Sequence, residues 1–267
     1  MLNTGNFFTL SDFPHAEIFP LNDFVWSALN SLKEYMNSLS YPVLYRSGLI
    51  QEGVPLTQTV VLYEDAFLEA ASLEITYGDT TKGKLSVCRE GRELAGATVI
   101  MAGSVFMGRQ IRLGRGVLVE SGAMIKSPAI IGDQTEVRQG AYLRGYCLTG
   151  KGCVLGHTTE IKHSIFLDNA KAGHFAYLGD SILGENTNLG AGTKFANLRF
   201  LPGNVTIRTE EGLIDTGRRK LGAILGDETQ TGCNSVTNPG TIIGKNSFLM
   251  PNATAKAGYH PPKTIIR

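Results

Sequence analysis

The chain has 267 residues, a formal net charge of +1 and a sequence pI of about 7.7. This balance gives no electrostatic reason to expect binding to nucleic acid or to an anionic membrane. No apolar run approaches the roughly 18 residues of a membrane span, and the first residues lack the basic region of a signal peptide. We therefore expect a cytoplasmic protein with one repeat domain and one smaller region.

Residues 1–98 form the smaller region, which we expect to be α+β. Apolar residues recur at three- and four-residue spacing from Phe24 to Met36, a pattern that predicts an amphipathic helix. Residues 43–98 alternate turn residues with strand-like runs such as Val60–Tyr63. Because a solenoid needs cover over its open end, we expect this region to cap the repeat domain. A substrate-recruiting module is the alternative.

Residues 99–267 carry a six-residue repeat. One slot of the repeat is mostly aliphatic and is filled by Met101, Met107, Leu113, Val119, Ile125, Ile131, Val137, Leu143, Thr149, Leu155, Ile161, Leu167 and Gly173. This period is neither helical nor a simple strand alternation, and it is typical of a hexapeptide β-helix. The phase breaks after Gly173 and resumes at Leu183. The sequence therefore predicts a mainly β, parallel β-helical domain.

Two further features bear on function before any similarity is considered. Residues 198–222 carry charge, Pro202 and Gly203 between repeat segments, so we expect an extended loop there. Connections longer than about 15 residues are usually functional or disordered. The four cysteines, including Cys147 and Cys153 in a small inward slot, have no metal-binding spacing, and we expect no metal.

Four motifs in the second half of the chain make a similarity specific. They are KAGHFAYLGD (171–180), NTNLGAGT (186–193), ANLRF (196–200) and GRRKLGA (217–223). With them, residues from about 130 to 267 resemble the acetyltransferase domain of bifunctional glucosamine-1-phosphate acetyltransferase/N-acetylglucosamine-1-phosphate uridylyltransferase, and the archaeal-type sugar-1-phosphate nucleotidylyltransferase/acetyltransferases most of all. The resemblance implies a left-handed helix with three hexapeptides per coil, acetyl-CoA as co-substrate and a homotrimer with sites between subunits.

The resemblance also implies site residues of three kinds. These are catalytic His174 and Glu160, substrate-binding Arg138, Lys162, Tyr177 and Asn188, and acetyl-CoA-binding Asn197, Lys220, Cys233 and Pro251. His174 would take the proton from the sugar amine, a step that suits an imidazole. Glu160 would orient it, and Arg138 and Lys162 would hold the sugar phosphate.

The coil size of eighteen residues gives this site a geometry. Arg138, Gly156 and His174 are spaced by eighteen, so we expect them to stack on one edge. Arg138 and His174 would then lie about 10 Å apart, with room for a phosphorylated sugar between them. Arg144 and Lys162 have the same spacing and should share a neighbouring edge.

We thus expect an acetyl-CoA-dependent N-acetyltransferase of a hexosamine-1-phosphate in nucleotide-sugar or cell-envelope synthesis. Three departures from the family keep alternatives open. We find no nucleotidylyltransferase phosphate loop, Cys233 stands where many relatives have Ser, and Leu198 stands where the bacterial enzymes have Tyr. The alternatives are a sugar-nucleotide-binding or scaffolding solenoid without catalysis, and an acyltransferase acting on a nucleotide-linked amino sugar.

A third alternative is a zinc hydratase of the gamma carbonic anhydrase type, which also has a helical β fold. It needs three histidines around one metal, and His157, His163 and His174 are available. The six-residue gap between the first two does not match the five-residue gap expected, so this reading is disfavoured.

Overall fold

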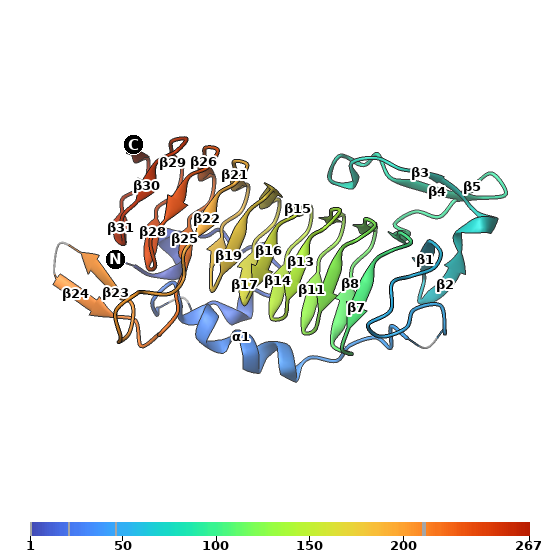
Figure 1. Cartoon of the computed structure of the whole chain (residues 1–267), viewed down its shortest axis with the longest axis horizontal. Coiled ribbons are helices and arrows are strands. Elements are labelled where there is room, and N and C mark those ends of the chain that lie inside the picture. The colour runs from blue at the N-terminus through green and yellow to red at the C-terminus, as the bar shows by residue number, and fades with distance from the viewer. Residues whose placement is uncertain (1, 21, 46, 210–211) are drawn as a thin grey trace.

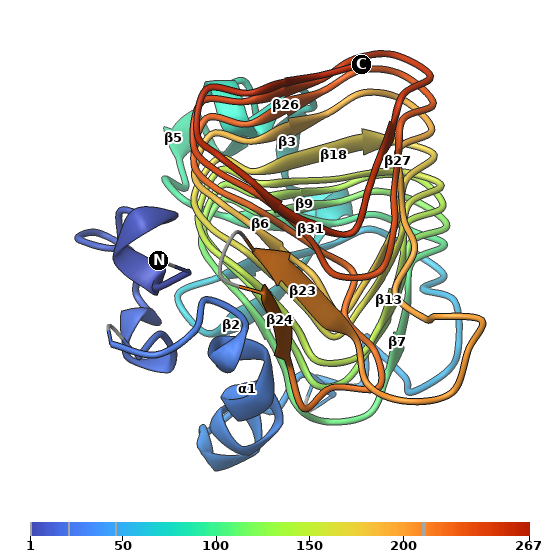
Figure 2. The same cartoon turned by 90° about the vertical axis from the view of Figure 1, so that its left-hand side faces the viewer.

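The computed structural model describes residues 2–20, 22–45, 47–209 and 212–267, and its main body is a parallel β-solenoid (Figure 1). The predicted mainly β fold is therefore confirmed. The coils stack into a three-sided tube when the molecule is viewed from its end (Figure 2). Each coil passes through the first, second and third sheet in turn. In the described part of the chain, no helix has the length and apolar character to cross a membrane.

Three long sheets form the sides of the tube. The first sheet contains, in spatial order, β2 (Ala66–Glu69), β1 (Val60–Tyr63), β6 (Thr98–Ile100), β9 (Leu118–Val119), β12 (Glu136–Val137), β15 (Val154–His157), β18 (Lys171–His174), β21 (Asn188–Leu189), β26 (Gln230–Thr231), β29 (Phe248–Leu249) and β32 (Ile265–Ile266). The second contains β7 (Val105–Met107), β10 (Met124–Lys126), β13 (Tyr142–Arg144), β16 (Glu160–Lys162), β19 (Tyr177–Gly179), β22 (Lys194–Phe195), β27 (Val236–Thr237) and β30 (Thr254–Ala255). The third contains β8 (Ile111–Leu113), β11 (Ala129–Ile131), β14 (Cys147–Thr149), β17 (Ser164–Phe166), β20 (Ile182–Leu183), β25 (Ala223–Leu225), β28 (Thr241–Ile243) and β31 (Gly258–His260).

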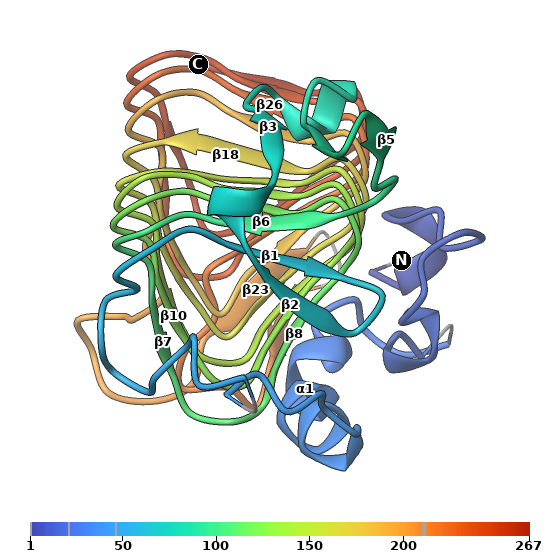
Figure 3. The same ribbon diagram turned by 90° about the vertical axis from the view of Figure 1, so that its right-hand side faces the viewer.

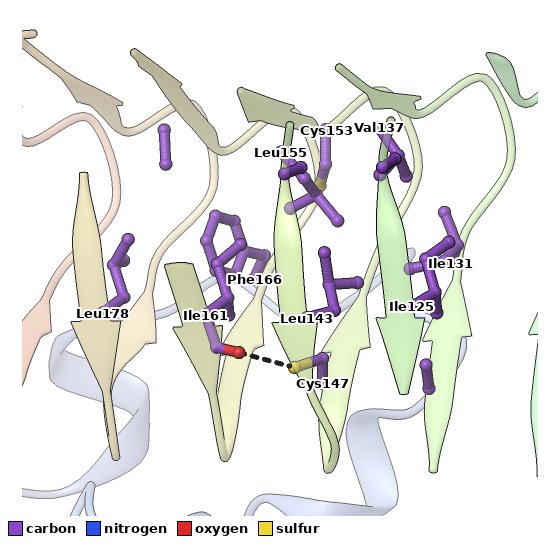
Figure 4. Packing of buried hydrophobic residues seen from close by; sticks show 14 of the residues in the cluster. Ile125, Ile131, Val137, Leu143, Cys147, Cys153, Leu155, Ile161, Phe166 and Leu178 are labelled. Carbon is purple, nitrogen blue, oxygen red and sulfur yellow. Dashed lines mark hydrogen bonds between the residues drawn. The ribbon is translucent and has the colours of Figure 1, made fainter. Parts of the chain in front are cut away.

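The aliphatic slot of the repeat fills the inside of the tube, where Ile125, Val137 and Leu143 are fully buried (Figure 4). The predicted phase, however, breaks earlier than Gly173. After Ile161 the next residue in the main core is Phe166, five positions on, and Leu167 packs outside the tube instead.

The physical reason is a shorter turn between the second and third sheets. Gly145 and Tyr146 connect β13 to β14, whereas His163 alone connects β16 to β17. His163 has φ of 48°, a left-handed conformation that closes the turn with one residue fewer. The coil from Glu136 to Val154 therefore takes eighteen residues, whereas the coil from Val154 to Lys171 takes seventeen.

The N-terminal region divides between the side and the end of the tube (Figures 1 and 3). The predicted amphipathic helix is α1 (Ser27–Ser38), which with η1 (Thr4–Asn6) and η2 (Ala16–Ile18) lies along the third sheet. Successive coils offer it one outward aliphatic residue each, namely Ile130, Leu148, Ile165, Ile182, Ile224 and Ile242. Leu44, Ile50 and Leu56 enter the main core instead, and β1 and β2 extend the first sheet in antiparallel fashion.

Two smaller sheets lie outside the tube. The strands β3 (Glu74–Thr76), β4 (Ser86–Arg89) and β5 (Arg92–Glu93), with η3 (Ala70–Ser72) and η4 (Thr80–Lys82) nearby, form an arm beside the first sheet. The segment predicted as an extended loop contains two paired antiparallel strands, β23 (Thr206–Thr209) and β24 (Gly212–Asp215). Its buried Val205 and Ile207 join the same apolar cluster as α1.

The packing of α1 against the solenoid predicts how a substitution on its buried face changes the free energy of unfolding. Leu32 is fully buried on α1, so Leu32→Ala should destabilise the fold by about 2–5 kcal/mol through lost burial and a residual cavity. Thermal and urea unfolding would measure the change, with the exposed neighbour Ser31→Ala as the matched control. Equal unfolding midpoints for the two variants would contradict the packing of α1 on the solenoid.

Candidate functional site

The predicted site residues separate onto two corners on either side of the second sheet. The first corner joins the first sheet to the second and begins where β18 ends at His174. The second corner joins the second sheet to the third and begins where β16 ends at Lys162. The outer face of the second sheet runs between the two groups.

His174 is exposed at the first corner, and its ladder partner in the preceding coil is His157. The Nδ1 atom of His157 lies 3.0 Å from the carbonyl oxygen of Gln139, and its ring packs edge-on against Phe175 with centroids 5.2 Å apart. Among the described residues, none forms a side-chain hydrogen bond with the ring of His174. This imidazole is therefore open to exchange a proton with a bound molecule.

The residues predicted to contact acetyl-CoA partly share this corner. The ladder registers place Ala191, Cys233 and Pro251 in the coils that follow His174, in one column. With coils about 4.8 Å apart, Cys233 lies about 10 Å from His174 along the tube. Asn188 is exposed on the first sheet beside this column. The candidate base and part of the candidate donor site thus lie along one edge.

Arg138 is close to the first corner but not in the column of His174. The prediction that the two residues stack is wrong by one position, because the coil from Gly156 to Gly173 has seventeen residues. The Arg138 guanidinium pairs with the buried Glu136, with Nη2 and Oε2 2.8 Å apart. Its Nη1 atom still reaches the coil of His174, since a Cβ on Gly173 would lie 3.8 Å from it.

A second group lies on the outer face of the second sheet. Arg144 donates from Nη1 to Oε1 of Glu160 at 2.6 Å, and Lys162 follows Arg144 in the same column of the ladder. Tyr177 is the ladder neighbour of Glu160, and its hydroxyl donates to Oδ1 of Asn197 at 3.4 Å. Glu160 is therefore engaged by Arg144, and within one chain no described hydrogen bond joins it to a histidine.

Behind this face, the second corner holds a buried polar column. His163, Asp180 and Asn197 come from three successive coils and are 6%, 7% and 9% exposed. The Asn197 Nδ2 atom donates to Oδ2 of Asp180 at 2.7 Å, and Nδ1 of His163 lies 3.1 Å from Oδ1 of Asp180. His163 Nδ1 has no assigned hydrogen-bond partner, so this second interaction is a close polar contact. Gly179 is small because a Cβ there would lie 2.4 Å from Asn197.

Burial alone would raise the pKa of the Asp180 carboxyl. Its contacts with His163, followed by those with Asn197 and Arg218, outweigh burial and hold this pKa below its ordinary value. Asp180 is therefore ionised at neutral pH and is the charge around which the corner is organised.

The segment 198–222, which forms a long insertion between repeat segments, begins and ends at this corner. It leaves after Asn197, and the backbone N–H of Leu221 donates back to the Asn197 carbonyl at 3.0 Å. Arg218 spans two elements, since its Nη2 lies 3.3 Å from Oδ1 of Asp180 and its Nη1 donates to Oδ1 of Asn30 on α1 at 2.6 Å. The insertion thus ties α1 to the solenoid corner that carries Lys162.

Arg144 and Asp180 were not among the predicted site residues, and Arg218 was predicted only as a helper of Lys220. The eighteen-residue spacing of Arg144 and Lys162 was the signal for the first. Asp180 closes the KAGHFAYLGD motif, but its role needs the shortened turn at His163, which the sequence does not reveal. Arg218 depends on the path of the insertion.

The histidines are not arranged for a shared metal within the chain. His157 and His174 lie at the first corner, whereas His163 is buried at the second corner beside Asp180. Among the described residues there is no group of three His, Cys, Asp or Glu side chains that could hold a metal ion.

Comparison with known proteins places the similarity in the solenoid. Residues 125–242 match the family model described as the GMPPB C-terminal domain. The chain is 38% identical over 121 residues to a bifunctional sugar-1-phosphate nucleotidylyltransferase/acetyltransferase of Sulfurisphaera tokodaii, covering 45% of this chain and 30% of the relative. It is 38% identical over 109 residues to the bifunctional protein GlmU of Methanocaldococcus jannaschii, covering 41% and 26%.

A solved UDP-N-acetylglucosamine acyltransferase of Francisella novicida aligns with a TM-score of 0.39 and 14% identity, covering 58% of this chain and 55% of that one. The matched part of the chain covers less than a third of the length of the Sulfurisphaera tokodaii and Methanocaldococcus jannaschii relatives. The second half of the chain resembles the C-terminal acetyltransferase region of these bifunctional enzymes.

The depressed pKa of Asp180 makes a prediction about acid stability. A carboxyl of this kind stabilises the fold above its unfolded pKa of about 3.9, and the contribution is lost as pH falls through the lower folded value. Asp180→Asn should therefore lower the unfolding free energy at neutral pH by about 1–3 kcal/mol.

The difference between Asp180→Asn and the parent should shrink on acidification below about pH 4. Urea unfolding at several pH values measures it, and Asn at the exposed Asp12 is the control. A constant difference across this range would rule out the proposed ionised state.

Proposed function

We propose that this protein is an acetyl-CoA-dependent N-acetyltransferase whose acceptor is a phosphorylated amino sugar. The observation that carries the proposal is the clustering of Arg144, Lys162 and Tyr177 on one sheet face, one corner away from the open imidazole of His174. The similarity to sugar-1-phosphate acetyltransferases supports the same class of acceptor.

In the proposed reaction His174 is the general base. It takes a proton from the sugar ammonium group or from the attacking amine, whose nitrogen then bonds to the thioester carbonyl carbon. The carbon–sulfur bond breaks, and the CoA thiolate leaves and takes the proton back from the His174 imidazolium to become a thiol. An imidazole titrates near neutral pH, so it can accept this proton without a large driving force.

The donor is proposed to lie along the first corner. An extended pantetheine arm that followed the column of Ala191, Cys233 and Pro251 would deliver its thioester to His174. Asn188 borders this path. Asn197 and Lys220, in contrast, lie at the second corner. They can contact acetyl-CoA bound along a first corner only if a second corner also lies against the same acetyl-CoA molecule.

We propose that a homotrimer resolves this separation. Within one chain, Glu160 is bound by Arg144 and lies across the second sheet from the first corner. If the second corner of one subunit faces the first corner of its neighbour, the acceptor ligands and His174 complete one site. The orienting role proposed for Glu160 depends on this arrangement.

The proposed role of His174 as general base predicts the effect of removing its imidazole. His174→Ala should lower kcat by about 100- to 10,000-fold without dissociating the oligomer. Release of CoA thiol from acetyl-CoA measures it, against amino sugars with and without the 1-phosphate. His157→Gln, one coil away, is the matched control and should retain turnover.

Thiol release that survives His174→Ala would remove the base assignment. No release with any amino sugar, from the folded parent protein, would favour a binding or scaffolding solenoid.

The second prediction separates the two arginines near the site. Both arginines are paired with a carboxylate, but Arg144 shares a column with Lys162, whereas Arg138 is held by the buried Glu136. We therefore assign the phosphate contact to Arg144 and expect Arg144→Ala to raise KM for the phosphorylated acceptor about tenfold, with kcat changed less. Arg138→Ala should raise this KM less. A larger KM effect from Arg138→Ala would restore the phosphate role that the sequence predicts for it.

A further inference from the structure

A cavity of about 570 Å³ lies between α1 and the second corner, and α1 forms one wall of it. Leu29, Asn30 and Lys33 line it from α1, and Arg144, Tyr146 and Lys162 line it from the solenoid. Its volume is within the range of roughly 300–1,000 Å³ that is usual for sites of small organic ligands, so it has room for more than one phosphate group.

The cavity carries an excess of positive charge. Arg218 is balanced by Asp180 at 3.3 Å, and Arg144 by Glu160 at 2.6 Å. Lys33, Lys162 and Lys220 also line the cavity, and no ion pair with a described carboxylate is formed by any of the three. Three lysines from three separate elements therefore face one hollow with their charges uncompensated.

The position of Lys33 is set by packing. Its Nζ atom lies 5.5 Å from the centroid of the Tyr146 ring, which also lines the cavity, so a cation–π contact holds the ammonium group beside this wall. The helix itself is anchored by buried Leu29 and Leu32, and by the hydrogen bond from Arg218 to Asn30. The ammonium group is thus presented by a fixed element opposite Lys162.

We propose that this cavity, through Lys33, binds a second phosphate linked to the first, so that the acceptor is a nucleoside-diphosphate-linked amino sugar. The proposal rests on the proposed function for the identity of the acceptor. Arg144 and Lys162 are sufficient for one phosphate, and Lys33 provides a cation for the second phosphate. The N-terminal region then acts as a specificity element beside its packing role.

Binding of simple anions tests the cavity independently of catalysis. Isothermal titration calorimetry would compare inorganic phosphate, inorganic pyrophosphate and a nucleoside diphosphate on the full chain. We expect pyrophosphate and the nucleoside diphosphate to bind more tightly than phosphate. Lys33→Ala should weaken pyrophosphate binding about tenfold and leave phosphate binding nearly unchanged.

Lys84→Ala, which removes an exposed lysine outside the lining of the cavity, is the matched control and should leave all three affinities unchanged. Because Lys33 is exposed on α1, its replacement should not alter the unfolding midpoint. Lys33→Glu should abolish the preference for pyrophosphate. Equal affinity for phosphate and pyrophosphate, or equal losses in the Lys33 and Lys84 variants, would overturn the proposal.

Measuring acetylation of both acceptors, the sugar 1-phosphate and the diphosphate-linked sugar, distinguishes failure of this inference from failure of the proposed function. Acetylation of the sugar 1-phosphate but not of the diphosphate-linked sugar would overturn the inference and leave the acetyltransferase proposal standing. Preferential acetylation of the diphosphate-linked sugar, reduced by Lys33→Ala through KM, would support both.

Discussion

In-register stacking of parallel coils is the constraint on which the structure depends. Because each coil hydrogen-bonds to the next at about 4.8 Å, a residue at one position of the repeat is placed directly beside its counterpart in the neighbouring coil. Residues distant in sequence therefore become columns, such as His163, Asp180 and Asn197. The same constraint makes a shortened turn consequential, since the residues that follow it in the next coil move by one position relative to a strict six-residue count.

The shortened turn at His163 explains which features of the solenoid the six-residue period could predict and which it could not. The aliphatic period was sufficient to predict a parallel β-helix and the buried slot from Leu113 to Ile161. Its first members were predicted wrongly, because Phe106 enters the core in place of Met107, which is 37% exposed. The period could not predict the alignment of Arg138 with Gly173 instead of His174, because the omitted residue at His163 leaves the local pattern of polar and apolar residues nearly intact. The motif around His174 still indicated the first corner, since motif similarity does not depend on coil length.

The second corner could be predicted only in part. Lys162, Tyr177 and Asn197 were predicted site residues, and they lie together there. The contribution of α1 was not foreseeable, because an amphipathic helix with one apolar face does not indicate which side of a tube it will cover. The outward aliphatic residues of the third sheet determine where α1 packs. This packing places Lys33 of α1 in the lining of the same cavity as Lys162. Packing of an apolar face thus determines where a charged side chain on the other face is presented.

We propose that His174 of one subunit and the face carrying Arg144 and Lys162 of its neighbour form one acetyltransferase site. The most direct measurement is the activity of mixed oligomers made by co-expressing His174→Ala and Lys162→Ala chains, assayed at an acceptor concentration well below KM, where each variant alone has little activity. If sites are shared between neighbours, random assortment in a trimer restores about one site in four, and thiol release from acetyl-CoA returns. Mixed oligomers that remain as inactive as either variant would contradict a site shared between subunits.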